Sequence, residues 1–234
     1  MIKDNIYMSV EDNYKRIVEN VQAAELKAGR GDKVRIMAVT KMVDVERIKT
    51  AIACGISLLG ENRVQEYLSK CGEYPKSCEI HFIGGLQSNK IKPLFRQHDR
   101  ISMIQSVGSE KLAREIDAQT RLLHSDANIV TDILIQVNIG NEETKGGVFP
   151  DELYGLVEAV DRLDYVRLRG LMTIPPKGES IKYFAKMQRL FEDLKSNVST
   201  ADTLSMGMSE DYAVAVEYGS NIVRVGTALF GQRF

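Results

Sequence analysis

Residues 33–55, KVRIMAVTKMVDVERIKTAIACG, contain one complete unit of the pattern that decides the fold. The first nine residues, KVRIMAVTK, form an apolar run with few turn residues, which is typical of a strand covered on both faces. The following stretch, 44–55, ends at Gly55, and glycine is a common helix stop. Its apolar side chains recur at helical spacing: Val45, Ile48, Ala51 and Ile52. The unit therefore predicts a strand followed directly by a helix.

The same unit recurs along the whole chain. Apolar runs that predict strands occupy residues 33–41, 56–62, 79–85, 100–107, 130–140, 165–174, 203–208 and 221–231. Helix-like stretches lie between them and include 44–55, 109–123, 150–163, 179–196 and 209–219. A further helix, at roughly residues 8–28, precedes the first strand.

This alternation decides between fold classes. A strand, a helix and a second strand in succession imply parallel pairing with a right-handed crossover. Eight strands, with a helix after each of the first seven, favour an α/β fold in the form of a closed (β/α)8 TIM-type barrel. A doubly wound open sheet is the alternative. No linker rich in Pro, Gly or Ser divides the chain, so we expect one domain over residues 1–234.

Composition and charge narrow the classes of function. Apolar residues make up 44% and charged residues 27%, as in ordinary globular proteins. The net charge of −1 gives no strong attraction to nucleic acid or to an anionic membrane surface. No apolar run approaches the roughly 18 residues of a membrane helix, and the N-terminus lacks the apolar core of a signal peptide. We expect a cytoplasmic protein.

Cysteine and histidine residues predict neither disulfides nor a metal site. The three cysteines, Cys54, Cys71 and Cys78, are odd in number and form no C-x-x-C pair, so we expect them to be reduced. The three histidines are scattered, and no metal-binding motif such as H-E-x-x-H is present.

The ends of the strands are where a barrel of this kind carries its binding residues. Strand seven runs into Gly207, and Ser209 is predicted to begin a helix; strand eight carries Gly226 and Thr227. Loops after strands seven and eight often bind phosphate, since backbone N–H groups and hydroxyls converge there. Alternatively, Ser209 is only a helix cap and Thr227 only a strand-forming residue. Longer turns also follow strands five and six, and PPKGE is the second of them.

Lys41 ends strand one, which barrel closure places beside strand eight. We expect Arg224, Gly226 and Ala228 to share one face of strand eight, with the two small residues leaving room for a ring beside the arginine. A lysine beside an anion site suggests a phosphorylated aldehyde held as a Schiff base, and pyridoxal 5′-phosphate (PLP) is the obvious candidate. Alternatively, Lys41 steadies a simple phosphate ligand or extends into solvent.

Seven segments carry a resemblance to a known family. AVTK, LLGENRVQE, HFIGGLQSNK, VNIGNEETKGG, LMTI, LSMGMSEDY and VRVGTALFG resemble, in order, the hallmark segments of the pyridoxal phosphate homeostasis protein family. The resemblance covers roughly residues 8–231. It extends to the N-terminal barrel domain of alanine racemase, which implies a fold type III PLP-binding barrel. One small departure is Thr40, where the family often has serine.

The resemblance implies roles for individual residues. It implies that Lys41 is the Schiff-base lysine and that Asn62 lies beside the cofactor. It places Ser209, Gly226 and Thr227 at the phosphate and Arg224 near the pyridine nitrogen. Met206 and His81 fall in or near the family's pocket segments.

The function expected from these residues is to hold PLP and to buffer or deliver it, with PLP-dependent apoenzymes as possible recipients. Racemases of this fold carry a second, all-β domain, and this chain stops at Phe234, so we expect a monomer that is not an enzyme. A charged Arg224 also disfavours protonation of the pyridine nitrogen, which weakens the ring as an electron sink. Two alternatives are a weak PLP-dependent amino-acid racemase and a barrel that binds another phosphorylated metabolite without a Schiff base.

Overall fold

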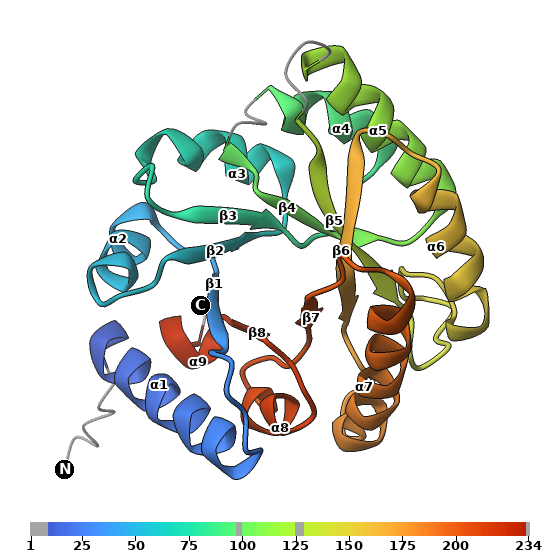
Figure 1. The fold of residues 1–234 in the computed structure, drawn as a ribbon. Helices are drawn as coiled ribbons and strands as arrows, with labels where there is room; N and C mark the ends of the chain where they lie inside the picture. Colours follow the sequence, from blue (N-terminus) through green and yellow to red (C-terminus); the bar gives the residue numbers. More distant parts are fainter. Residues whose placement is uncertain (1–8, 97–99, 125–128, 233–234) are drawn as a thin grey trace, which may run out of the picture.

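Eight parallel strands close into a barrel in sequence order, and β8 returns to pair with β1 (Figure 1). The structure is a computed structural model that describes residues 9–96, 100–124 and 129–232. The predicted TIM-type barrel is confirmed, and the doubly wound alternative is wrong. The strands are β1 (Arg35–Val39), β2 (Leu58–Glu61), β3 (Glu79–Phe82), β4 (Met103–Val107), β5 (Thr131–Val137), β6 (Val166–Thr173), β7 (Thr203–Ser205) and β8 (Ile222–Val225).

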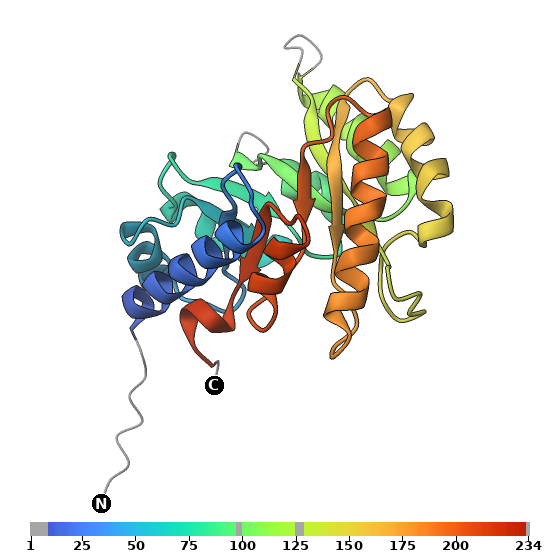
Figure 2. The same ribbon diagram turned by 60° about the horizontal axis from the view of Figure 1, so that its bottom comes forward.

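Helices form the outer layer around the strands (Figures 1 and 2). A helix follows each strand, as predicted for the first seven. The helices are α1 (Val10–Lys27), α2 (Val45–Ala53), α3 (Val64–Lys70), α4 (Ser88–Phe95), α5 (Glu110–His124), α6 (Leu153–Asp161), α7 (Ser180–Asn197), α8 (Tyr212–Glu217) and α9 (Thr227–Phe230). Short 3₁₀ turns occupy Cys71–Glu73 and Pro150–Glu152. Residue 8, where the first helix is predicted to begin, lies outside the described residues.

Helix α1 covers the seam where the barrel closes. It begins after Ser9, whose hydroxyl accepts a hydrogen bond from the backbone N–H of Asp12 at 3.0 Å, a common N-cap arrangement. Its buried side chains include Ile17 and Val21. The helix packs against α8 and α9, the two helices on either side of β8 (Figures 1 and 2). Burial of this apolar stripe therefore holds the last strand beside the first.

Alternate residues along each strand divide the core into two regions. Outward-facing side chains pack with the helices in one large cluster. Inward-facing side chains fill the barrel, and two apolar clusters lie there. One consists of Met37, Val39, Leu58, Ile83 and Ile222, and the other of Met103, Leu134 and Met172.

Strand β8 is shorter than predicted, and this corrects the expected placement of Ala228. The strand ends at Val225, and the chain then turns into α9. The carbonyl oxygen of Gly226 accepts hydrogen bonds from Leu229 N at 3.0 Å and Phe230 N at 2.8 Å. The apolar run 221–231 therefore changes from strand to helix, because Leu229 and Phe230 are buried with α1 in the outer cluster. Ala228 does not share a strand face with Arg224.

Gly84 allows the end of β3 to approach the end of β2. A Cβ atom at Gly84 would lie 1.9 Å from the backbone oxygen of Asn62, whereas a Cβ atom at Gly85 would meet nothing within 4 Å. The loop after β3 therefore packs directly on the backbone that carries Asn62.

Replacement of Gly84 by alanine is expected to destabilise the protein by about 1–3 kcal/mol, the usual cost of forced overpacking. The clash involves backbone on both sides, so it cannot be relieved by a change of rotamer. The free energy of unfolding in urea measures the effect, and Gly85→Ala is the matched control. Equal stability of the two variants would contradict the close contact with Asn62.

Candidate functional site

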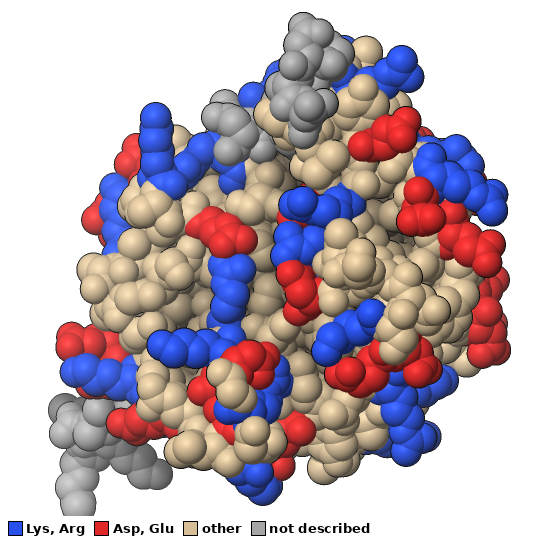
Figure 3. Space-filling model, viewed as in Figure 1, with Lys and Arg blue, Asp and Glu red and all other residues tan. Residues whose placement is uncertain are grey.

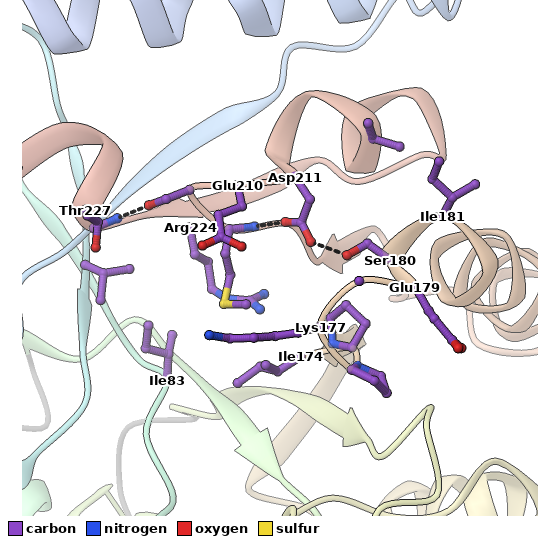
Figure 4. A pocket seen from close by; sticks show the side chains of 18 of the residues that line it. Ile83, Ile174, Lys177, Glu179, Ser180, Ile181, Glu210, Asp211, Arg224 and Thr227 are labelled. Carbon is purple, nitrogen blue, oxygen red and sulfur yellow. Dashed lines mark hydrogen bonds between the residues drawn. The ribbon is translucent and has the colours of Figure 1, made fainter.

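A cavity of about 1010 Å³ opens at the C-terminal ends of the strands. Loops after β1, β2, β3, β6, β7 and β8 contribute to its wall (Figure 4). Six of the seven residues predicted to bind a cofactor line it: Lys41, Asn62, Ser209, Arg224, Gly226 and Thr227. The fold therefore brings together residues that are up to 186 positions apart in the sequence, from 41 to 227.

Lys41 lies two residues beyond the end of β1 and is half-buried. Its side chain lines the cavity and makes no hydrogen bond or ion pair with any residue in the described part of the chain. A primary amine without a partner at the wall of a cavity can react with a carbonyl group. The position of Lys41 therefore fits the role of a nucleophilic amine.

The backbone on either side of Lys41 is anchored to the neighbouring strand and helix. Thr40 is fully buried, and its hydroxyl donates a hydrogen bond to Glu61 Oε1 at 2.7 Å. Met42 follows with a positive φ of 57°, and its backbone N–H donates to the side chain of Glu66 at 2.5 Å. Lys70 Nζ donates to the carbonyl oxygen of Val43 at 2.7 Å. These contacts fix where the Lys41 side chain begins.

Glu61 supports this anchor from behind the strand and does not line the cavity. Its Oε1 accepts hydrogen bonds from Thr40 and, at 2.7 Å, from the hydroxyl of Tyr74. Burial raises the pKa of Glu61 above the usual range of a carboxyl group. It also raises the pKa of the Tyr74 hydroxyl, so this group stays a hydrogen-bond donor at neutral pH.

Ser209 lies where two backbone N–H groups converge. Its Oγ accepts hydrogen bonds from Gly226 N at 3.2 Å and Ala228 N at 3.0 Å. This corrects the prediction that Ser209 begins a helix, because α8 begins only at Tyr212. The N-cap alternative for Ser209 fails for the same reason. Two backbone N–H groups thus point at one oxygen atom, and converging N–H groups of this kind are also what binds an anion.

Asp211 holds the loop that carries Ser209. One carboxylate oxygen accepts from Met208 N at 2.7 Å, and the other accepts from the Ser180 hydroxyl at 2.6 Å (Figure 4). The first contact forms a tight turn, and this turn delays the start of α8. Gly207, at the beginning of the loop, has a φ of +90°, and a Cβ there would lie 2.5 Å from the Cβ of Ala215. The loops after β6 and β7 are thereby joined.

Arg224 places a buried positive charge in the wall of the cavity. Its side chain is 3% exposed. The guanidinium donates to Ser205 Oγ at 2.8 Å and to the carbonyl oxygen of Thr173 at 2.7 Å. Burial lowers the pKa of Arg224 to about 10, so the group remains charged at neutral pH. Within the described part of the chain, no carboxylate forms an ion pair with it, which leaves its charge available to a ligand.

Asn62 adds a polar atom in need of a partner. Its Oδ1 is buried and has no hydrogen-bond partner among the described residues. Buried polar atoms are usually paired, so an orphan in a cavity wall indicates a ligand contact.

Lys177 is a second lysine at the cavity that the sequence did not single out. It belongs to the loop after β6 and is exposed, and Figure 4 shows its side chain extending into the cavity on the side of Ile83. The long turn PPKGE was the available signal, but the direction of a loop side chain cannot be read from sequence. Any test of Lys41 therefore has to include Lys177.

A family of known proteins matches almost the whole chain. The model of the alanine racemase N-terminal domain family matches residues 13–233. A curated relative from Aquifex aeolicus, named pyridoxal phosphate homeostasis protein, is 43% identical over 97% of this chain and 99% of its own length. The chain belongs to the pyridoxal phosphate homeostasis protein family.

Solved structures agree with this membership. PipY of Synechococcus elongatus PCC7942, solved with PLP bound, has a TM-score of 0.75 and 32% identity, and the match covers 92% of this chain and 100% of PipY. Alanine racemase from Corynebacterium glutamicum has a TM-score of 0.66 at 16% identity, over 95% of this chain and 62% of the racemase. At that identity, the racemase supports the fold alone.

Met206 is the one predicted cofactor-binding residue that does not line the cavity. It is fully buried in the outer cluster, and its backbone N and O atoms bond to the hydroxyl of Ser220. Met208 lines the cavity instead. The reason for this correction is the alternation along β7: Ser205 faces the barrel interior, whereas Leu204 and Met206 face the outer cluster. His81 is also absent from the cavity wall, since it lies deeper on β3.

The face of the protein that Figure 3 shows has no large patch of one charge sign. Basic and acidic side chains are interspersed on the face in Figure 3, as a net charge of −1 leads one to expect. Within the described ranges, no helix is long and apolar enough to cross a membrane. No group of three or more His, Cys, Asp or Glu residues in those ranges could hold a metal ion.

Proposed function

We propose that this protein holds PLP reversibly through a Schiff base at Lys41, and that it buffers the cofactor or delivers it to other proteins in the cytoplasm. The observation that carries the proposal is the convergence on one cavity of an amine without a partner among the described residues, a buried guanidinium, and the side chains of Ser209 and Thr227. The names of the relatives and the PLP bound to PipY support the choice of ligand.

The residues present fit each end of this ligand. For the phosphate, Ser209 and Thr227 offer hydroxyls, and beside them lie the backbone N–H groups of Gly226 and Ala228, which donate to Ser209 Oγ in this structure. For the ring, Arg224 offers a charged donor and Asn62 an unsatisfied oxygen. For the aldehyde end, Lys41 offers a primary amine.

When bound, the cofactor supplies an electrophilic aldehyde and a ring that can delocalise electrons. Lys41 would hold the aldehyde carbon through Nζ as a C=N bond, with the aldehyde oxygen released as water. Ser209 and Thr227 orient the phosphate, and the loop tied by Asp211 keeps Ser209 in place. Arg224 stays charged at neutral pH and so keeps a proton off the pyridine nitrogen. A ring in that state is a weak electron sink, which favours holding the cofactor over catalysis.

The carrier proposal predicts two results for the purified protein loaded with PLP. It should restore activity to an added PLP-dependent apoenzyme, because the C=N bond is reversible. It should exchange the α-hydrogen of alanine with deuterium slowly or not at all, as followed by proton NMR. Free PLP at the same concentration is the control for both measurements. Racemisation of a common amino acid at about 1–1000 turnovers per second, the range of enzymes, would replace the carrier by the racemase alternative.

A further inference from the structure

A chain of hydrogen-bonded polar side chains runs through the interior of the barrel from Arg224. The guanidinium Nη1 of Arg224 donates to Ser205 Oγ at 2.8 Å, and Ser205 Oγ donates to Gln105 Oε1 at 2.7 Å. Gln105 Nε2 lies 2.8 Å from His81 Nδ1, and His81 Nε2 lies 2.8 Å from Glu79 Oε1. Glu79 in turn forms an ion pair with Arg35.

This chain of hydrogen bonds spans the barrel from one end to the other. Ser205 lies on β7 and Gln105 on β4, and these strands are not neighbours in the closed sheet, so their contact crosses the interior. Arg35 and Glu79 are the first residues of β1 and β3 and lie at the end opposite the cavity. The three central members, Ser205, Gln105 and His81, are all fully buried.

Only one arrangement of hydrogens satisfies every member of the chain. Gln105 Nε2 is a donor, so His81 Nδ1 has to be the acceptor and the proton of the neutral ring lies on Nε2. That proton then points at the Glu79 carboxylate, while the Gln105 oxygen is free to accept from Ser205. With the amide reversed, Ser205 would face two donors and its own hydrogen would lose its acceptor. Burial lowers the pKa of His81, which agrees with a neutral ring.

We propose that Ser205 and Gln105 are positioning residues that fix the guanidinium of Arg224 toward the ring end of the cavity, with His81 and Glu79 as the anchor of the chain. Ser205 accepts from Arg224 in a fixed direction because its own hydrogen is committed to Gln105. Gln105 is fixed in turn because His81 donates to Glu79. This proposal rests on the proposed function only for the identity of the ring that Arg224 faces.

The first test uses the protein without ligand. In the wild type, both Nη groups of Arg224 have fixed acceptors, so its guanidinium N–H signals should be resolved by ¹⁵N NMR. Gln105→Met keeps the length of the side chain but removes both hydrogen bonds, and it should broaden or shift these signals. Ser205→Ala is a second variant that removes the direct contact. Thr120→Val is the matched control, because it removes a buried hydrogen bond to Thr131 that does not belong to the network from Arg224 to Glu79.

The second test uses the bound cofactor. Gln105→Met should weaken PLP binding by about 2–10-fold, the value of one hydrogen bond, and shift the visible absorption band. An analogue with carbon in place of the pyridine nitrogen should bind the variant and the wild type alike, since Arg224 has no nitrogen to face. Thr120→Val should change neither ligand.

Two outcomes would overturn the positioning role, and a third separates it from the proposed function. Unchanged Arg224 signals in both Gln105→Met and Ser205→Ala would overturn the positioning role, whatever the ligand. Equal weakening of PLP and the carbon analogue would also overturn it, because a merely structural role affects both. If wild-type protein binds no PLP but the NMR result holds, the positioning role of Ser205 and Gln105 is supported and the proposed function fails.

Discussion

Replacement of Lys41 by alanine is expected to abolish the yellow colour that PLP gives to the wild-type protein. The colour comes from the C=N bond, and Lys41 supplies its nitrogen in our proposal. The fold should remain, because Lys41 is half-buried beyond the end of β1 and has no partner among the described residues. The visible absorption spectrum after addition of PLP measures the first effect, and the thermal midpoint of unfolding measures the second.

The matched control for this prediction is Lys177→Ala. Lys177 carries the same amine into the same cavity but comes from an exposed loop. This variant should keep its colour. A yellow Lys41→Ala protein together with a colourless Lys177→Ala protein would move the attachment site to the loop after β6.

Removal of two hydroxyls, by Ser209→Ala with Thr227→Val, should weaken PLP binding by roughly 10²–10⁴-fold. Each lost hydrogen bond to a charged phosphate is worth about 1.5–3 kcal/mol, and about 1.4 kcal/mol corresponds to a factor of ten. Some binding should persist, because the N–H groups of Gly226 and Ala228 remain in the variant.

Pyridoxal, which lacks the phosphate, is the internal control for this double variant. Its affinity should hardly change, since neither hydroxyl has a role at the ring or the aldehyde. Equilibrium titration of both compounds gives the two ratios. A similar loss for pyridoxal and PLP would place the phosphate in another part of the cavity.

The barrel could be predicted from the sequence because its signal is repeated eight times. Each apolar run is followed by a helical stretch, so an error at one boundary does not change the topology. The predicted element boundaries are wrong where the local preference for strand or helix competes with tertiary packing. The run 221–231 contains strand-forming residues throughout, yet α9 forms after Gly226 because Leu229 and Phe230 pack against α1.

The site was predictable as a set of strand ends but not in its details. The alternation along β7 places Met206 with Leu204 in the outer cluster, and the turn at Gly207, which follows no sequence period, brings Met208 to the cavity. Lys177 was missed because a loop side chain has no period to follow. The role of Ser209 depends on Gly226 and Ala228, residues on another loop that only the closed barrel brings near.

The hydrogen-bonded network inside the barrel has a signal in the sequence that lies away from the strand ends. Gln105 and Ser205 are polar residues inside apolar strands that are covered on both faces. Such residues need partners, and in a barrel the inward-facing ones can only find them across the interior. Their presence in mid-strand was therefore a readable sign of a buried network, although its path could not be deduced without the register of the strands.

The most direct test of the central claim is chemical reduction of the wild-type protein loaded with PLP. Borohydride converts the C=N bond into a stable C–N bond, and mass spectrometry of the digested protein then locates the added mass. Our account predicts that the modification lies on the peptide containing Lys41 and that the yellow colour disappears with it. Modification of the peptide containing Lys177, or no modification of any lysine in a protein that was yellow, would contradict the account.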